Sequence, residues 1–294
     1  MIITSSEQLR ELTGSFFANA DFDRIKGIVA NVQAETALII GTRVMAWMEE
    51  DGKDSEAAAA CKTAIAYMAT LRYYRLNDIS HEDMGRKVKI DKENEARPFE
   101  WQLARDDRMH LEEYYRALDR MIDALQEVEE FKSSRLWNLS SALIVKNADS
   151  LNYLTGVDPS PWLYVRLIPF LSDSQKYVEK AYGEGFDNIV NAGDELQHAA
   201  QMAVALGAIA MMGRRCSLQT LPYGLMKIFE SDGGGNRMEA ASLDRLDDYL
   251  KHLSKEQHYW LNEMKQLRDE AAGKEAATYL QMPENDKQNK FMRV

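Results

Sequence analysis

The chain has 294 residues, of which 45% are hydrophobic and 28% charged, and its formal net charge is -11. This length and composition predict a folded protein of two domains, because single domains usually contain about 100 to 150 residues. The negative charge repels phosphate groups and argues against sequence-specific binding of nucleic acid. No apolar run reaches the ~20 residues of a membrane span, and the first residues lack a secretory signal, so we expect a cytoplasmic protein without membrane contact.

In chain order, the first predicted element is a short helix that begins after Thr4-Ser5-Ser6-Glu7 and ends at Gly14. A hydroxyl followed by an acid caps helix starts, and glycine adopts the positive φ that ends helices. Apolar residues at helical spacing then predict one long helix from Phe22 to Trp47. A third helix, from Ala57 to about Leu76, is Ala-rich on most sides, so we expect it at the centre of a helical bundle.

The stretch after the third helix changes pattern. Residues from Lys87 to Phe99 alternate and then turn, which predicts a β-hairpin or a projecting arm. A long amphipathic helix follows, with apolar positions from Trp101 to Leu125. The segment from Phe131 to Ser141 then leads into the second half of the chain.

The second half repeats this order of elements. Residues 144–156 align with residues 2–14 at an offset of 142, with identical Ile, Leu, Leu, Thr and Gly residues. Further along, Lys227 matches Lys87 and Arg237 matches Arg97 at an offset of 140. A near-constant offset indicates an internal duplication. We therefore predict a mainly α fold of two tandem helical-bundle repeats, residues 1–140 and 141–282, each with a small β-hairpin or arm.

Within the second repeat, a long helix is predicted to start near Pro161, with Pro169 kinking or delaying it. An apolar helix is predicted from Leu196 to Arg215, and a final amphipathic helix with apolar positions from Leu243 to Leu267. The second hairpin or arm is expected between Leu225 and Asn236. Residues 283–294 are polar, and we expect them to form a flexible tail.

Glu195 and His198 are the sharpest candidates for metal ligands. Glu-x-x-His places both side chains on one face of a helix, as in di-iron four-helix bundles. Such a centre needs a second Glu-x-x-His, and none of the other four histidines has Glu three positions before it. We therefore expect a surface or helix-start pair and no bound metal or cofactor. A helical-bundle metalloprotein that uses these two residues is kept as an alternative.

No arrangement of residues typical of catalysis stands out. The glycine-rich stretch from Ser231 to Asn236 lacks the Lys-Ser/Thr ending of a phosphate-binding loop, and we interpret it as a hairpin tip. Cys61 and Cys216 lie in or next to apolar helical segments, which predicts buried thiols rather than a disulfide. The sequence thus favours a protein that is not an enzyme.

Three stretches of the first repeat carry a resemblance to a known family. They are Thr4 to Leu9, then Ala20-Asp21-Phe22-Asp23 through Gly41, and Ala64 through Tyr73-Tyr74-Arg75. This order of a capped helix, an acidic loop, a long helix and an apolar helix resembles the small head-tail connector (adaptor) proteins of tailed bacteriophages. The whole chain is also similar to uncharacterised proteins of prophage structural gene clusters. The family usually has one unit per chain, and the second repeat has Met211-Met212-Gly213-Arg214-Arg215 where the first has the Tyr-Tyr-Arg ending.

The resemblance implies a virion assembly role, in which subunits form a ring between portal-like and tail-like proteins and contact neighbours through hairpins or tails. It implies a homo-oligomer with protein partners. Candidate partner contacts are Arg97, Arg237, Lys89, Phe229 and Phe291. Arg97 and Arg237 occupy matched positions, where they could either bind a partner's carboxylates or cap and bracket their own domain. The alternative function is a cytoplasmic helical module that binds a protein or peptide.

Overall fold

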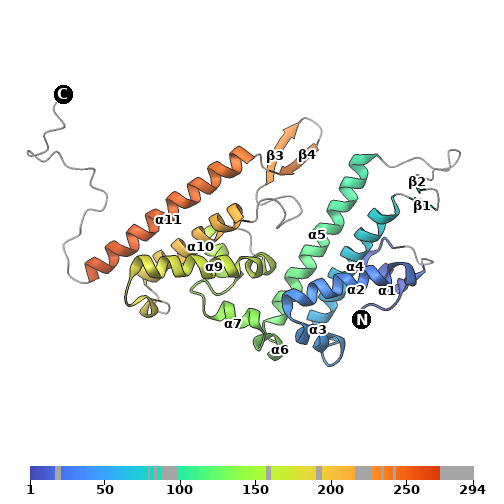
Figure 1. Cartoon of the computed structure of the whole chain (residues 1–294), viewed down its shortest axis with the longest axis horizontal. Coiled ribbons are helices and arrows are strands. Elements are labelled where there is room, and N and C mark those ends of the chain that lie inside the picture. Colours follow the sequence, from blue (N-terminus) through green and yellow to red (C-terminus); the bar gives the residue numbers. More distant parts are fainter. Residues whose placement is uncertain are drawn as a thin grey trace, which may run out of the picture. The chain divides into compact units, whose positions relative to one another are not determined.

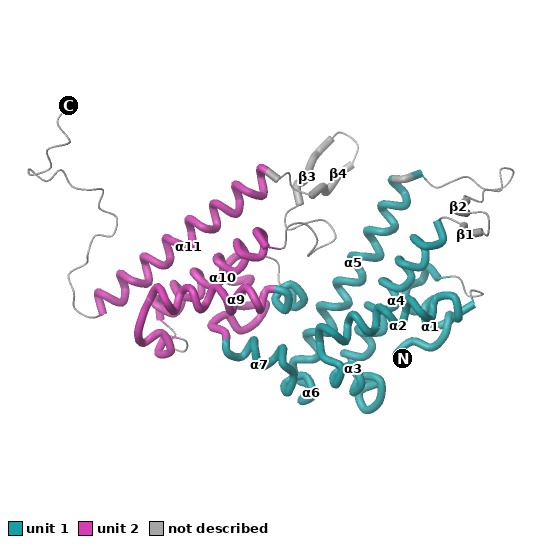
Figure 2. The backbone as a smooth tube through the Cα atoms, viewed as in Figure 1, with its two compact units in different colours: residues 1–142, 159–166 teal, residues 143–158, 167–294 magenta. Residues whose placement is uncertain are grey.

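The computed structural model describes residues 1–16, 21–78, 80–82, 85–87, 99–156, 160–189, 194–215, 227–232, 235–240 and 243–271. These residues form eleven α-helices, one 3-10 helix and two short strand pairs (Figure 1). The mainly α class predicted from the sequence is confirmed. The chain folds as two compact units (Figure 2): unit 1 comprises Met1–Ala142 and Pro159–Arg166, and unit 2 comprises Leu143–Asp158 and Leu167–Val294. The repeat boundaries after residues 140 and 282 stay predictions.

Unit 1 begins with the capped helix expected from the sequence. The Ser5 hydroxyl accepts a hydrogen bond from the Gln8 N–H, and Gly14 ends the helix with φ of +68°. The elements of unit 1 that precede the second unit are α1 (Ser6–Thr13), α2 (Phe22–Ile40), α3 (Thr42–Glu49), α4 (Glu56–Asn77), β1 (Ser80–Glu82), β2 (Gly85–Lys87), α5 (Glu100–Leu125), α6 (Glu129–Lys132) and α7 (Arg135–Ser141).

The prediction of a single helix from Phe22 to Trp47 is wrong, because the helix is interrupted at Gly41. Gly41 has φ of +101°, and its N–H donates to the Ala37 carbonyl oxygen at 2.9 Å, which ends α2. The next residue begins α3. Ile40 and Val44 are buried on either side of the break, so the apolar periodicity continues through it and conceals it.

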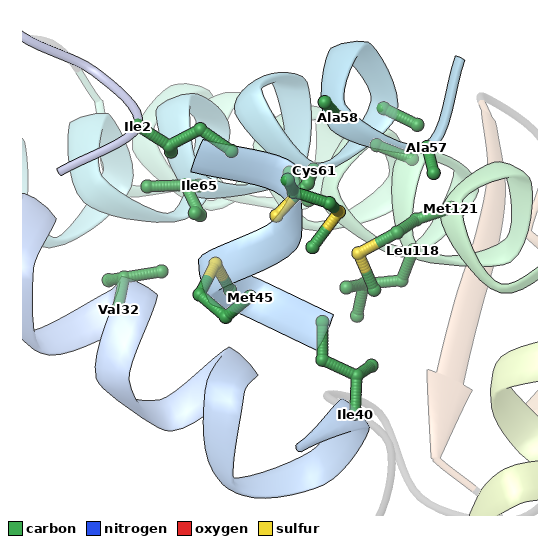
Figure 3. Close-up of a cluster of buried hydrophobic side chains, with 14 of the residues drawn as sticks. Ile2, Val32, Ile40, Met45, Ala57, Ala58, Cys61, Ile65, Leu118 and Met121 are labelled. Atoms are coloured by element: carbon green, nitrogen blue, oxygen red, sulfur yellow. The ribbon is translucent and has the colours of Figure 1, made fainter. Parts of the chain in front are cut away.

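Helix α4 is central in unit 1, as its Ala-rich composition predicted. It packs against α5, α2 and α1. Its small side chains allow neighbouring backbones to approach closely, and larger side chains such as Ile65, Leu118 and Met121 fill the space that remains (Figure 3). Burial of an aliphatic side chain of this size contributes roughly 1.5–3 kcal/mol. The unit therefore has a hydrophobic core of its own.

Unit 2 contains a long helix that passes through a proline. Its elements are α8 (Ala148–Thr155), α9 (Pro161–Tyr182), η1 (Phe186–Asn188), α10 (Glu195–Arg215), β3 (Lys227–Asp232), β4 (Gly235–Ala240) and α11 (Leu243–Ala271), with the first six residues of α9 assigned to unit 1. Helix α9 starts at Pro161, as predicted. It continues beyond Pro169, which removes one backbone donor without ending the helix.

Helix α10 is the core helix of unit 2 and packs against α11 and α8. Within the described residues it is the one helix long and apolar enough to cross a membrane by length and composition. Of that stretch, 67% is buried within the protein, and the core helix of a globular unit passes the same test. We therefore interpret α10 as a core helix. The absence of membrane contact stays a prediction.

Several local features of unit 1 recur in unit 2, each 142 positions later. The Ile2 N–H donates to the Gln33 amide oxygen at 2.9 Å, and the Ile144 N–H donates to the Gln175 amide oxygen at 2.9 Å. Gly156 ends α8 with φ of +66°, as Gly14 ends α1. The Thr13 hydroxyl donates to the Leu9 carbonyl oxygen and the Thr155 hydroxyl donates to the Leu151 carbonyl oxygen, both at 2.8 Å.

Two antiparallel strand pairs follow the central helices. Strand β1 pairs with β2, in the register Ser80 with Lys87, and β3 pairs with β4, in the register Lys227 with Ala240. The first predicted hairpin, from Lys87 to Phe99, falls largely outside the described residues. The second, from Leu225 to Asn236, overlaps β3 and the start of β4. Whether either serves as a projecting arm stays a prediction.

Candidate interaction surfaces

The five predicted partner contacts are only partly described. Lys89, Arg97 and Phe291 lie outside the described residues. Phe229 of β3 pairs with Met238, and Arg237 of β4 pairs with Glu230, through their backbones. The structure describes the backbone of these strands and not their side chains. It therefore brings none of the five predicted residues together at a described surface.

Glu195 and His198 occupy the first turn of α10. Glu195 is the first residue of the helix and is exposed. The His198 ring lies edge-on to Trp260 of α11, with ring centroids 5.5 Å apart, and 6.4 Å from Tyr153 of α8. Among the residues that the structure describes, no group of three or more His, Cys, Asp or Glu side chains is placed to hold a metal ion. His198 thus contacts aromatic rings from two other helices.

These contacts extend into a surface that we call the aromatic row, formed by Tyr153, His198, Trp260 and Tyr259. The Tyr259 and Trp260 rings also meet edge-on, with centroids 5.3 Å apart. Tyr153 is 82% exposed and Tyr259 is 55% exposed, whereas His198 and Trp260 are half-buried. The row therefore combines a packed middle, which fixes its position, with two accessible phenol rings.

Carboxylates flank the aromatic row. Asp149 precedes Tyr153 by four positions on α8, Glu195 precedes His198 by three on α10, and Glu256 precedes Trp260 by four on α11. On the same helix, Glu263 follows Tyr259 by four. Residues three or four apart are neighbours on one helix face, so each ring has an acidic neighbour. Lys255, four positions before Tyr259, is the basic counterpart on α11.

A second apolar surface lies at the start of α5 in unit 1, and we call it the α5 edge. It is built around exposed Phe99 and Trp101; Leu103 and Met109 of α5 are also exposed, but Leu103 lies two positions after Trp101 and so on another side of the helix. Phe99 is 67% exposed and Trp101 58% exposed, and their rings stack with centroids 6.5 Å apart and planes 8° apart. Single exposed apolar residues are ordinary, but several neighbouring large ones mark interaction sites.

The α5 edge lies beside the end of α4. The Arg75 guanidinium of α4 binds the Asp107 carboxylate of α5 at 2.9 Å, which places the last turn of α4 next to this part of α5. Leu76, the residue after Arg75, is also exposed. Helices α4 and α5 therefore both carry exposed apolar residues near the Arg75–Asp107 ion pair.

A buried histidine lies close to this surface. The His110 Nδ1 atom lies 3.0 Å from the Asp106 carbonyl oxygen, which can only accept, so Nδ1 carries the hydrogen. The Nε2 atom then accepts from the Ser15 hydroxyl at 3.2 Å. Tyr74 donates to the Ser15 carbonyl oxygen at 2.6 Å, and its ring meets His110 edge-on. No sequence motif indicates this group of side chains, which attaches the residue after α1 to α4 and α5, and we interpret it as structural.

Comparison of the chain with protein-family models, curated proteins and solved structures finds no match. The aromatic row and the α5 edge are thus the surfaces from which a function can be inferred. Both are built from side chains on packed helices, and neither was identified from the sequence.

Proposed function

We propose that the protein is a non-enzymatic assembly or adaptor protein, of the kind represented by the head-tail connectors of tailed phages, which joins protein partners or copies of itself. The observation that carries this proposal is the α5 edge. Exposed and stacked Phe99 and Trp101 rings are costly to leave in water, and aromatic residues are enriched in the centres of protein interfaces. A partner that covers these rings removes that cost.

We further propose that the two units arose by duplication of one helical repeat. The matched hydrogen bonds of Ile2 and Ile144, and the matched helix ends at Gly14 and Gly156, support this proposal. Chance produces single matches of this kind easily. Matches that share one offset of 142 with the aligned sequence are harder to obtain without common ancestry. A duplicated chain suits an assembly in which each subunit makes two related contacts.

The aromatic row supports a second candidate function, a module that binds a protein or peptide. Its exposed Tyr153 and Tyr259 rings lie on a rigid helical base, which resembles the anchors of peptide-recognition surfaces. The two functions do not exclude each other, since the surfaces lie on different units.

The mass of the protein in solution tests the assembly proposal. We expect light scattering over a wide range of protein concentrations to show association beyond the monomer, for the full chain and less for a variant that lacks residues 283–294. A monomer at every concentration would contradict the proposed self-association. Failure of that monomer to bind portal-like or tail-like proteins encoded beside its gene would then remove the adaptor role.

Metal analysis tests the remaining alternative, the metalloprotein that uses Glu195 and His198. Stoichiometric iron, manganese or zinc in the purified protein, lost in a His198→Ala variant, would support it. Absence of such a metal would leave the assembly and peptide-binding proposals.

A further inference from the structure

We propose that the aromatic row binds a short extended segment of a partner protein in which Lys or Arg alternates with other residues. This inference goes beyond the assembly proposal, because it specifies the chemistry of a partner and does not require self-association. It rests on the spacing of the rings, on their exposure and on the charges beside them.

The spacing of the rings matches an extended chain. Ring centroids along the row are 6.4, 5.5 and 5.3 Å apart. In an extended segment, side chains two positions apart point to the same side and lie about 6.6 Å from each other. The spacing of same-side residues in such a segment is therefore close to that of the ring centroids, although neighbouring rings are edge-on to each other. The intervening side chains point away from the protein, and their identity is unconstrained.

The chemistry of the row favours cations. The face of a Tyr or Trp ring attracts an ammonium or guanidinium group. Tyr153 and Tyr259 are exposed enough to be covered in this way, whereas Trp260 is half-buried. Asp149, Glu195, Glu256 and Glu263 each lie one turn from a ring, whereas Lys255 is basic and the His252 Nε2 atom lies 3.4 Å from the Glu256 carboxylate. An acidic segment would meet these carboxylates and be repelled.

The chain's own basic C-terminal residues fit the row less well. Lys287, Lys290 and Arg293 lie three positions apart in the sequence. In an extended chain, residues three apart point to opposite sides. Two of these cations therefore cannot face neighbouring rings together, and the spacing favours a segment from a partner.

Fluorescence anisotropy with defined peptides tests this inference on the full chain. The probe is a labelled heptapeptide in which Arg alternates with Ser, and the control peptide has Glu in place of each Arg. We expect the Arg peptide to bind and the Glu peptide not to. Raising the salt concentration from about 0.05 to about 0.5 M should weaken binding, since exposed charges are screened. Tyr153→Ala should weaken it about three- to fivefold, because one cation–π contact is lost.

Matched variants separate this surface from general charge effects. Tyr177→Ala removes another exposed tyrosine of unit 2, on α9, and should leave the affinity unchanged. Asp149→Asn should weaken binding, whereas Glu184→Gln, at an exposed position after α9, should not. Because Tyr153 is largely exposed, its replacement should leave the helical circular dichroism spectrum unchanged.

Three results would overturn the inference. The first is equal binding of the Arg and Glu peptides, and the second is binding that Tyr153→Ala does not weaken. The third is absence of Arg-peptide binding to the wild type, whether it stays absent or appears after Lys287→Glu, Lys290→Glu and Arg293→Glu are combined; binding by that variant would make the chain's own C-terminal residues the occupant. None of these results affects the light-scattering test of assembly, so the two proposals fail separately.

Discussion

The Cys61 thiol lies within the core of unit 1 with none of its surface exposed (Figure 3). Burial, with a smaller effect of the Glu49 carboxylate, raises the pKa of Cys61 to about 12. The thiolate is the reactive form, so a buried thiol with this pKa is inert at neutral pH. In a Cys216→Ser background, we expect Cys61 to react with a thiol reagent only after denaturant is added. Rapid reaction of the native protein would contradict the packing around α4.

Glu35 joins two helices of unit 1 through a bidentate ion pair. Its carboxylate oxygens accept from the Arg72 guanidinium at 2.8 and 2.6 Å, and this hydrogen bonding lowers the pKa of Glu35. A carboxylate with a lowered pKa in the folded state stabilises the protein above its ordinary pKa, and the contribution is lost as the pH falls through the lowered value.

The second prediction follows from this pH dependence of the Glu35 contribution to stability. Glu35→Gln should lower the free energy of unfolding at pH 7 by no more than about 1 kcal/mol, because the pair is exposed. The difference from wild type should shrink as the pH falls below the ordinary glutamate pKa of about 4.3 and through the lowered pKa of Glu35, where the folded protein takes up the proton. Urea denaturation at several pH values measures it, with Glu11→Gln, at another exposed position, as the control. A difference that stays constant down to pH 2 would show that charge is not its cause.

Residue identity alone gave a mixed prediction of the candidate surfaces. The sequence pattern predicts a surface or helix-start pair for Glu195 and His198, with a metal site as the alternative, but it does not predict that the His198 ring contacts Tyr153 and Trp260. Tyr153 was overlooked, although it lies between the buried Leu151 and Leu154 in sequence and so off the apolar face of α8. A helical projection of that segment would have marked it as an exposed aromatic. The contact of three helices at His198 is a feature of the tertiary structure, and no local sequence pattern indicates it.

At the scale of elements, caps and periodicity predicted most helices, and their failures have one physical source. Ser5 and Gly14 act as the predicted start and end of α1. Gly41 ends the second helix although the apolar pattern does not change there, and α9 begins at Pro161 and continues through Pro169, so the proline does not delay the helix; a kink at Pro169 stays a prediction. Periodicity reports which side is buried, whereas a break depends on the backbone at one residue, which the rest of the core determines.

Gly207 of α10 gives the third prediction. A Cβ atom at this position would overlap the Gln257 amide of α11 and the Ser174 hydroxyl of α9. The Gln257 amide nitrogen donates to the Ala203 carbonyl oxygen at 3.2 Å, so it cannot move without losing that bond. Gly207→Ala should therefore destabilise unit 2 by about 1–3 kcal/mol, measured by urea denaturation.

Gly27 provides the matched control within α2. A Cβ atom there meets nothing within 4 Å, so Gly27→Ala should stabilise the protein by about 0.5–1 kcal/mol through helix propensity. The additional substitution Gln257→Ala should restore part of the stability lost in Gly207→Ala, since it removes the overlapping amide. If both glycine variants shifted the free energy of unfolding in the same direction, the close packing of α10 on α11 would not be the cause of the effect of Gly207→Ala.

At the scale of the whole molecule, composition and the internal offset predicted a mainly α chain and suggested two repeats. The structure has two compact units, and Pro159–Arg166 belongs to the first although it follows residues of the second. Sequence alignment could not predict this, because the assignment depends on contacts such as those of the Asp119 carboxylate. That carboxylate accepts from the Ser160 hydroxyl at 2.8 Å and from the Trp162 N–H at 2.9 Å. No periodic pattern links residues about 40 positions apart.

The final prediction concerns the α5 edge and the association of whole chains. If the stacked Phe99 and Trp101 form the contact, their replacement by Ala should abolish association in light scattering at concentrations where the wild type associates. Leu38, a leucine of α2 that is 82% exposed, provides the control, and Leu38→Ala should associate like the wild type. All three side chains are more than half exposed, so the fold should tolerate each change. Equal loss in both variants would mean that exposed apolar area in general drives association, whereas no loss in either would assign the contact to another surface.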